Sequence, residues 1–180
     1  MNPALQIFLL WLVLQAAVTD LALRRIPNVL IVSGLVLSLL LHWHTGADGA
    51  LLSTWLAGLA AGFFLFLPLY LARGMAAGDV KLMAMAGAFA GPVPALQIAI
   101  LTCLIGGLLA IGMLVVNGRW RILLHNLKTL LWPLLCRVAG YPVQAVVIDR
   151  QASAGDMPYG VAIALGTGAV VLQQHGFAFA

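Results

Sequence analysis

The sequence predicts an all-α, polytopic membrane protein with about six transmembrane helices. Hydrophobic residues make up 63% of its 180 residues and charged residues only 8%, and the mean hydropathy is +1.08, far from the composition of soluble domains. Apolar runs near the roughly 17–25 residues that a helix needs to cross a bilayer recur along the chain. The basic residues lie at the ends of these runs, which is typical of membrane topology signals, so we expect no nucleic-acid partner.

The first three spans are predicted at residues 3–20, 28–44 and 51–72. The first has no basic segment before it and is long for a signal-peptide core, so we expect it to be retained as a helix. Arg24, Arg25 and Pro27 separate it from the second span. A polar stretch at 42–49 separates the second span from the third.

The last three spans are predicted at residues 79–91, 94–116 and 157–177. The 79–91 run makes only about 20 Å of helix. If it were a re-entrant hairpin, segment 117–156 with its five basic residues would lie outside, so we predict a short crossing, shielded from lipid by its neighbours. Asp156-Met157-Pro158 is typical of a helix start, with Asp as the cap and Pro in the first turn.

The basic residues predict the orientation of the chain. With the N-terminus outside, all nine Lys and Arg residues lie on the cytoplasmic side, as the positive-inside rule requires. Residues 1–180 are expected to form a single membrane-embedded domain in which 117–156 is a cytoplasmic interfacial segment. Within this segment, apolar residues at 122–137 alternate with polar ones such as His125 and Lys128, which indicates a helix lying in the membrane interface. This helix could contact anionic lipid or a substrate leader, or it could serve as an amphipathic spacer.

Neither a metal nor an organic cofactor is expected. Cys103 and Cys136 stand alone, without the spacing of a zinc site or a disulfide framework. His42 and His44 are two residues apart and therefore do not share a helix face.

Glycines recur at four-residue spacing in the pairs Gly58/Gly62, Gly74/Gly78 and Gly87/Gly91. Such pairs allow membrane helices to approach closely. We expect packing surfaces within one chain, and the pattern leaves the oligomeric state open.

The five acidic side chains are all Asp, and an Asp at or near a membrane span is costly enough to suggest function. Asp20 and Asp79 are expected on different helices at the same membrane face. Peptide hydrolysis by two carboxylates needs one ionised group to take a proton from water and one protonated group to polarise the carbonyl. A close pair meets this requirement because like charges at short distance cannot both ionise.

Other interpretations of these residues remain open. Asp20 could pair with Arg24 one turn later, and Asp79 could cap a helix or pair with Lys81. Taken singly, each carboxylate fits these structural roles better, but two carboxylates at matching depth favour function. Asp48 is expected in a solvated loop outside the membrane. Asp149 and Asp156 are rival candidates on the cytoplasmic side, and Asp156 fits a helix cap better than catalysis.

Three motifs resemble the type IV prepilin peptidases, a group of GxGD membrane aspartyl proteases. They are Asp20 with Arg24-Arg25-Ile26-Pro27-Asn28, Gly78-Asp79-Val80-Lys81-Leu82-Met83-Ala84, and Pro158-Tyr159-Gly160-Val161-Ala162. The resemblance implies that Asp20 and Asp79 are the catalytic pair. It also implies cleavage of the short basic leader of type IV or Flp prepilin-like proteins, after a Gly, at the cytoplasmic face of the bacterial inner membrane.

The chain departs from the family pattern in two respects. The GxGD motif would place Gly at position 76, where this chain has Ala76. Alanine bends less freely than glycine, so we expect the loop before Asp79 to be less free to bend than in the family. Larger members also have an N-terminal region with paired CxxC motifs and methylate the new N-terminus. The chain resembles the short Flp/Tad-type members, which are peptidases without methyltransferase activity.

Supporting roles are expected for residues around the two carboxylates. Gly78 would leave room for a substrate backbone, and Lys81 would tune the adjacent carboxylate or mark the membrane boundary. Asn28, Tyr159 and Gly160 are expected around the substrate. The alternatives left open are a small membrane transporter, in which Asp binds a cation, and a non-enzymatic pilus-assembly scaffold.

Overall fold

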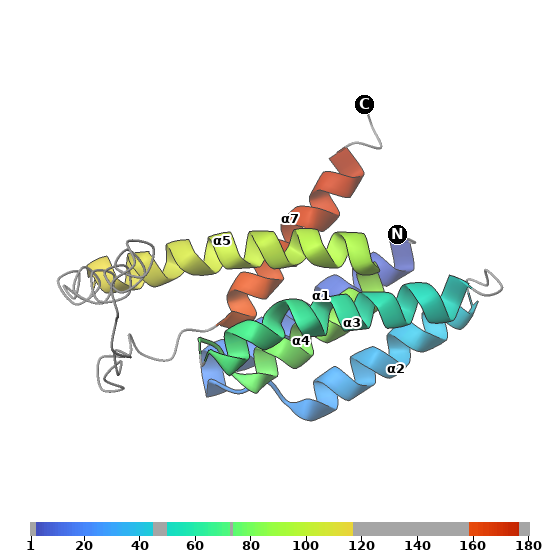
Figure 1. Ribbon diagram of the computed structural model, residues 1–180, viewed down its shortest axis with the longest axis horizontal. Coiled ribbons are helices and arrows are strands. Elements are labelled where there is room, and N and C mark those ends of the chain that lie inside the picture. Colours follow the sequence, from blue (N-terminus) through green and yellow to red (C-terminus); the bar gives the residue numbers. More distant parts are fainter. Residues whose placement is uncertain (1–2, 45–49, 73, 117–158, 177–180) are drawn as a thin grey trace, which may run out of the picture. The chain divides into compact units, whose positions relative to one another are not determined.

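The computed structural model describes residues 3–44, 50–72, 74–116 and 159–176. These residues form α-helices joined by turns and short connections, and no strand occurs among them. In chain order the helices are α1 (Pro3–Leu23), α2 (Asn28–His44), α3 (Ala50–Leu71), α4 (Ala77–Ala90), α5 (Pro92–Val116) and α7 (Tyr159–Gly176) (Figure 1). The predicted all-α fold is confirmed.

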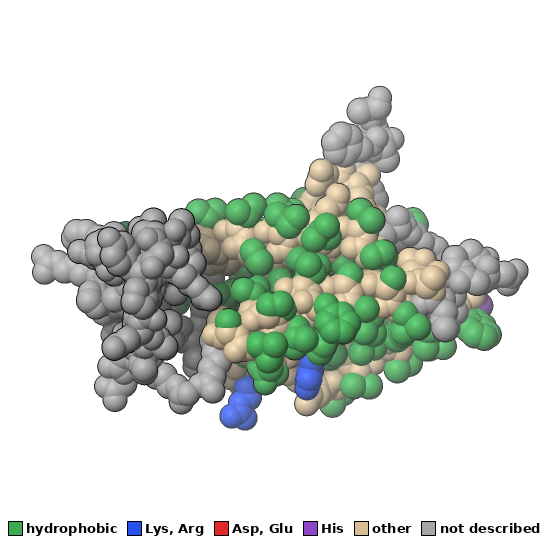
Figure 2. Space-filling view, in the orientation of Figure 1, with side chains coloured by type: hydrophobic (Ala, Val, Ile, Leu, Met, Phe, Trp, Pro, Cys, Tyr) green, Lys and Arg blue, Asp and Glu red, His purple; other side chains and the backbone are tan. Residues whose placement is uncertain are grey.

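Several of these helices have the length and composition of membrane spans. Three are long and apolar enough to cross a bilayer, at Pro3–Leu23, Ser53–Leu71 and Pro92–Met113, and the apolar stretches Asn28–His44 and Tyr159–Gln174 are shorter. Large apolar side chains such as Trp11, Phe64 and Leu108 are exposed, and hydrophobic side chains are spread over the described part of the face shown in Figure 2. This surface suits hydrocarbon rather than water. The protein is an all-α polytopic membrane protein.

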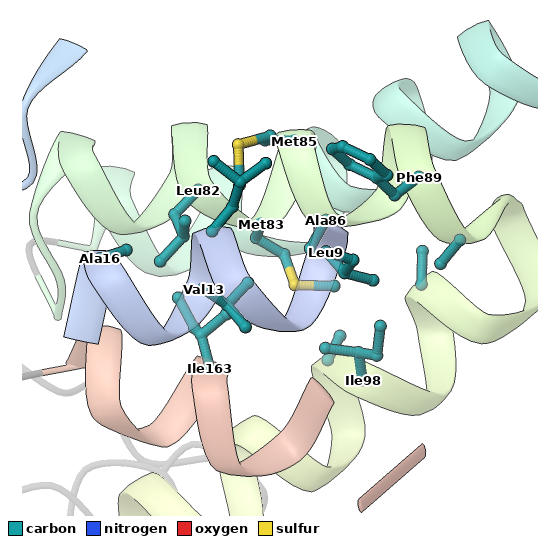
Figure 3. Close-up of a cluster of buried hydrophobic side chains, with 14 of the residues drawn as sticks. Leu9, Val13, Ala16, Leu82, Met83, Met85, Ala86, Phe89, Ile98 and Ile163 are labelled. Carbon is teal, nitrogen blue, oxygen red and sulfur yellow. The ribbon is translucent and has the colours of Figure 1, made fainter. Parts of the chain in front are cut away.

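Helix α4 forms the centre of the packing. Every residue from Leu82 to Ala90 is buried, and α4 contacts α1, α2, α3 and α7. Its Leu82 and Met83 meet Val13 of α1 and Ile163 of α7 in the cluster shown in Figure 3. A short helix that carries an acid is thus enclosed by other helices instead of facing lipid.

The helix ends differ from the prediction in ways that local chemistry explains. We expected the fifth helix to begin at 94, but it begins at Pro92, because proline fits the first turn of a helix. Gly91, with φ 86°, makes the sharp turn from α4 to α5, and its N–H donates to the Gly87 carbonyl at 2.8 Å. Helix α1 continues to Leu23, so that Asp20 lies in its last turn.

The glycines at four-residue spacing pack α3 on α4. A Cβ on Gly58 would collide with the Gly87 carbonyl, and one on Gly62 would collide with the Met83 carbonyl. The prediction of packing within one chain is therefore confirmed for these residues. It does not hold for Gly74 as part of a helix–helix contact, because Gly74 precedes α4 and a Cβ there would meet the Leu69 carbonyl.

The chain divides into two compact units, residues 1–106 with 158–180, and residues 107–157. The packing described above belongs to the first unit. Of the second unit, the described part is the end of α5. The predicted interfacial segment 117–156, including the helix expected at 122–137, lies outside the described residues, and the single-domain assignment stays a prediction.

Candidate active site

Asp20 is held by the first turn of another helix. It lies in the last turn of α1 and is buried, with 7% of its surface exposed. Its Oδ2 accepts the backbone N–H of Gly160, the second residue of α7, at 2.8 Å. The first N–H groups of a helix have no partner within that helix. Asp20 therefore satisfies one of these groups, and the partial positive charge of the α7 N-terminus favours a carboxylate there.

Asp79 occupies the corresponding place at the start of α4. It is 4% exposed, and its Oδ2 accepts the N–H of Ala76 at 3.1 Å. Ala76 is the N-cap residue and Asp79 the third residue of the helix, so the carboxylate reaches back as the acid of a capping box does. The predicted capping role of Asp79 is thus present, although Asp79 is not itself the N-cap.

The alanine that replaces the family glycine causes no backbone strain. Ala76 has φ −82° and ψ 156°, an extended conformation open to any residue. A glycine at this position is therefore not required for the backbone geometry that presents its N–H to Asp79.

The structure brings the two carboxylates together at one end of the helix packing. Asp20 and Asp79 interact electrostatically, and so do Asp79 and the phenol of Tyr159. The C-terminal end of α1 meets the N-terminal ends of α4 and α7, which pack against it and against each other. Two carboxylates that interact in a buried site oppose each other's ionisation. Such a pair is suited to general acid–base chemistry.

Lys81 of α4 and Asn28 of α2 form a side-chain contact. The Lys81 Nζ donates to the Asn28 Oδ1 at 3.1 Å, and both residues are exposed. Asn28 is the first residue of α2, so the contact joins the starts of α2 and α4. Lys81 follows Asp79 by two residues, and residues so spaced do not share a helix face.

Gly78 and Tyr159 both pack against neighbouring elements. A Cβ on Gly78 would lie 3.5 Å from the Ile26 side chain, an ordinary contact. The half-buried Tyr159 ring rests on α5, where a Cβ on Gly106 would lie 3.3 Å from the ring Cε1. The expected roles of Gly78 and Tyr159 toward a substrate stay predictions.

Two contacts were missed by the sequence analysis. Gly160 was expected beside the substrate, whereas its N–H is bonded to Asp20. Gln6 and Gln174 form a side-chain hydrogen bond of 3.3 Å between α1 and α7. An amide within an apolar run is a signal that could have pointed to the glutamine pair.

Within the part of the chain that the structure describes, Asp20 and Asp79 are the acids. The described residues include no group of three or more His, Cys, Asp or Glu side chains that could hold a metal ion. His42 donates from Nδ1 to the Ser38 carbonyl at 2.8 Å, a bond within its own helix. The other acids, Asp48, Asp149 and Asp156, and also Cys136, lie outside the described residues.

Residues 7–111 match the type IV leader peptidase family. This range includes Asp20 and Asp79 but ends before Tyr159 and Gly160. Neither a curated protein nor a solved structure matches the chain.

Proposed function

Because the chain belongs to the type IV leader peptidase family, we propose that it is a membrane aspartic endopeptidase. It removes the leader peptide of type IV or Flp prepilin-like proteins at the cytoplasmic face of the bacterial inner membrane, and it does not methylate the new N-terminus. The observation on which the proposal depends is the meeting of two buried carboxylates, Asp20 and Asp79, at the ends of neighbouring helices.

In the proposed mechanism Asp20 and Asp79 share the acid and base roles. The ionised carboxylate takes a proton from a water molecule, and the protonated one donates a hydrogen bond to the carbonyl of the scissile peptide. The oxygen of the water attacks the carbonyl carbon and forms a tetrahedral intermediate. The C–N bond then breaks as the amine leaves with a proton from the pair. Each carboxylate is oriented by a backbone N–H at the start of a helix.

The surroundings of the pair fit a substrate that arrives from the membrane surface. Lys81 and Asn28 are exposed and join two helix starts near Asp79. We assign Asn28, Gly78, Lys81 and Tyr159 to the support of the site and of the bound leader. The partners of the protein are then prepilin or pseudopilin substrates and membrane lipid, with no cofactor.

The direct test is to incubate the purified, detergent-solubilised protein with a panel of prepilins and to map the N-terminus of each product. We expect a single cut after the Gly that precedes the hydrophobic pilin segment. A prepilin in which that Gly is replaced by Leu serves as the matched substrate control. A panel left uncut, or cuts scattered through the leader, would contradict the proposal.

The proposed orientation predicts which residues a membrane-impermeant thiol reagent reaches in intact cells. In a variant without Cys103 and Cys136, a cysteine introduced at position 47 should be labelled from outside and one at position 76 should not. The reason is that the N-terminus-outside topology places all basic residues on the cytoplasmic side. Position 76 should become reactive after the membrane is permeabilised. The reverse pattern would place both carboxylates at the wrong face.

A further inference from the structure

Helices α1 and α7 are joined by two polar contacts at opposite ends of their interface. At one end the Gly160 N–H donates to the Asp20 Oδ2 at 2.8 Å. At the other the Gln6 Nε2 donates to the Gln174 Oε1 at 3.3 Å. The apolar residues between them include Val13 and Ile163, both buried, whose side chains lie side by side in Figure 3.

The spacing of these contacts fixes one antiparallel register. Gln6 and Asp20 are fourteen residues apart in α1, and Gly160 and Gln174 are fourteen residues apart in α7. Fourteen residues make almost four helical turns, about 21 Å, so both contacts lie on the same face of each helix. A slip of one residue would rotate α7 by about 100° relative to this face. Only this register therefore presents the Gly160 N–H to Asp20 while the glutamines remain paired.

The contact at Gly160 leaves no space for a side chain. A Cβ at this position would lie 2.9 Å from Asp20 Oδ2, 3.0 Å from its Cβ and 3.2 Å from its Cγ. Atoms this close must move apart. Among the described glycines, Gly91 is the one with a positive φ, so the backbone conformation does not demand glycine at position 160. The requirement comes from the approach of the Asp20 carboxylate.

We propose that Gly160 is a positioning residue for leader cleavage. Its N–H holds the Asp20 carboxylate, and its lack of a side chain leaves the space that this carboxylate occupies. The inference rests on the proposed catalytic role of Asp20. It replaces the expectation that Gly160 lines the substrate. The N-terminus of α7, far from α1 in sequence, thereby becomes part of the catalytic geometry without touching the substrate.

The test compares Gly160→Ala with Gly168→Ala on the same helix. A Cβ on Gly168 would meet nothing within 4 Å, so this control makes the same chemical change where there is room. We expect Gly160→Ala to lower kcat about 10-fold or more at unchanged KM, because the new methyl group must displace the Asp20 carboxylate and the rate depends steeply on the position of a catalytic group. Gly168→Ala should stay within about twofold of the wild type in both constants.

A raised KM with unchanged kcat would overturn the inference, because it would place Gly160 in contact with the substrate. Wild-type kinetics of Gly160→Ala would overturn it as well. If Gly160→Ala does not fold, a chain with an ester in place of the Tyr159–Gly160 amide removes the N–H without adding an atom. The ester should lower kcat about 10- to 100-fold at unchanged KM, and wild-type kinetics would refute the role of the N–H.

The same assay separates this inference from the proposed function. Wild-type activity of either Asp20→Asn or Asp79→Asn would refute the catalytic pair. If those variants are inactive while Gly160→Ala and the ester cleave as the wild type does, the catalytic pair stands and the positioning role of Gly160 fails.

Discussion

Replacement of Asp20 or Asp79 by Asn is expected to abolish leader cleavage, with a fall in kcat of at least about 1,000-fold. An amide has nearly the shape of the carboxyl group but cannot take up or release the proton that the reaction needs. Its oxygen can still accept the bond from Gly160 in Asp20→Asn, or from Ala76 in Asp79→Asn. Both variants should therefore insert and fold, with a thermal midpoint close to that of the wild type.

The measurement is single-turnover cleavage of a purified prepilin, with the thermal midpoint determined on the same preparations. Asp48→Asn and Asp149→Asn make the same chemical change at acids that the proposed mechanism does not use, and both should remain active. Cleavage at the wild-type rate by either Asn variant of the pair would remove that carboxylate from the mechanism.

The sequence was sufficient to predict the helices that the structure describes, because each signal lies within one run of residues. The apolar runs account for α1, α2 and α3 to within a few residues. The start of α5 was misplaced because two prolines stand two residues apart, and a break at either one is locally possible. The turn at Gly91 decides between them, since its positive φ ends α4 and leaves Pro92 in the first turn of α5.

Only those parts of the candidate site that depend on local signals could be predicted from the sequence. Asp20 and Asp79 stand out as acids at the ends of apolar runs, and the matching depth of the two runs predicts that they meet. The bond from Gly160 to Asp20 joins residues 140 apart in sequence and depends on the register of α7 on α1. No local pattern determines that register. The contact of Lys81 with Asn28 is also long-range, so the sequence related Lys81 only to its neighbour Asp79 or to the membrane boundary.

The contact between α3 and α4 leads to the prediction with the largest expected effect on stability. Gly58→Ala and Gly87→Ala should each lower the free energy of unfolding by about 3 kcal/mol. The new methyl of each variant would collide with a backbone carbonyl of the other helix. Backbone cannot turn aside as a flexible side chain can, so the helices must separate, and membrane helices depend on close packing for their association. The measurement is reversible unfolding in mixed detergent micelles.

Gly112→Ala and Gly168→Ala provide matched controls, since a Cβ at either position would meet nothing within 4 Å. These variants should be neutral or more stable by up to about 1 kcal/mol, because alanine favours the helical state over glycine. Separation of α3 from α4 would also move Asp79, which lies at the start of α4. We therefore expect Gly58→Ala and Gly87→Ala to lose leader cleavage together with stability. If both variants were as stable as Gly168→Ala, α3 and α4 would not pack backbone to backbone, and the placement of Asp79 against Asp20 would have to be reconsidered.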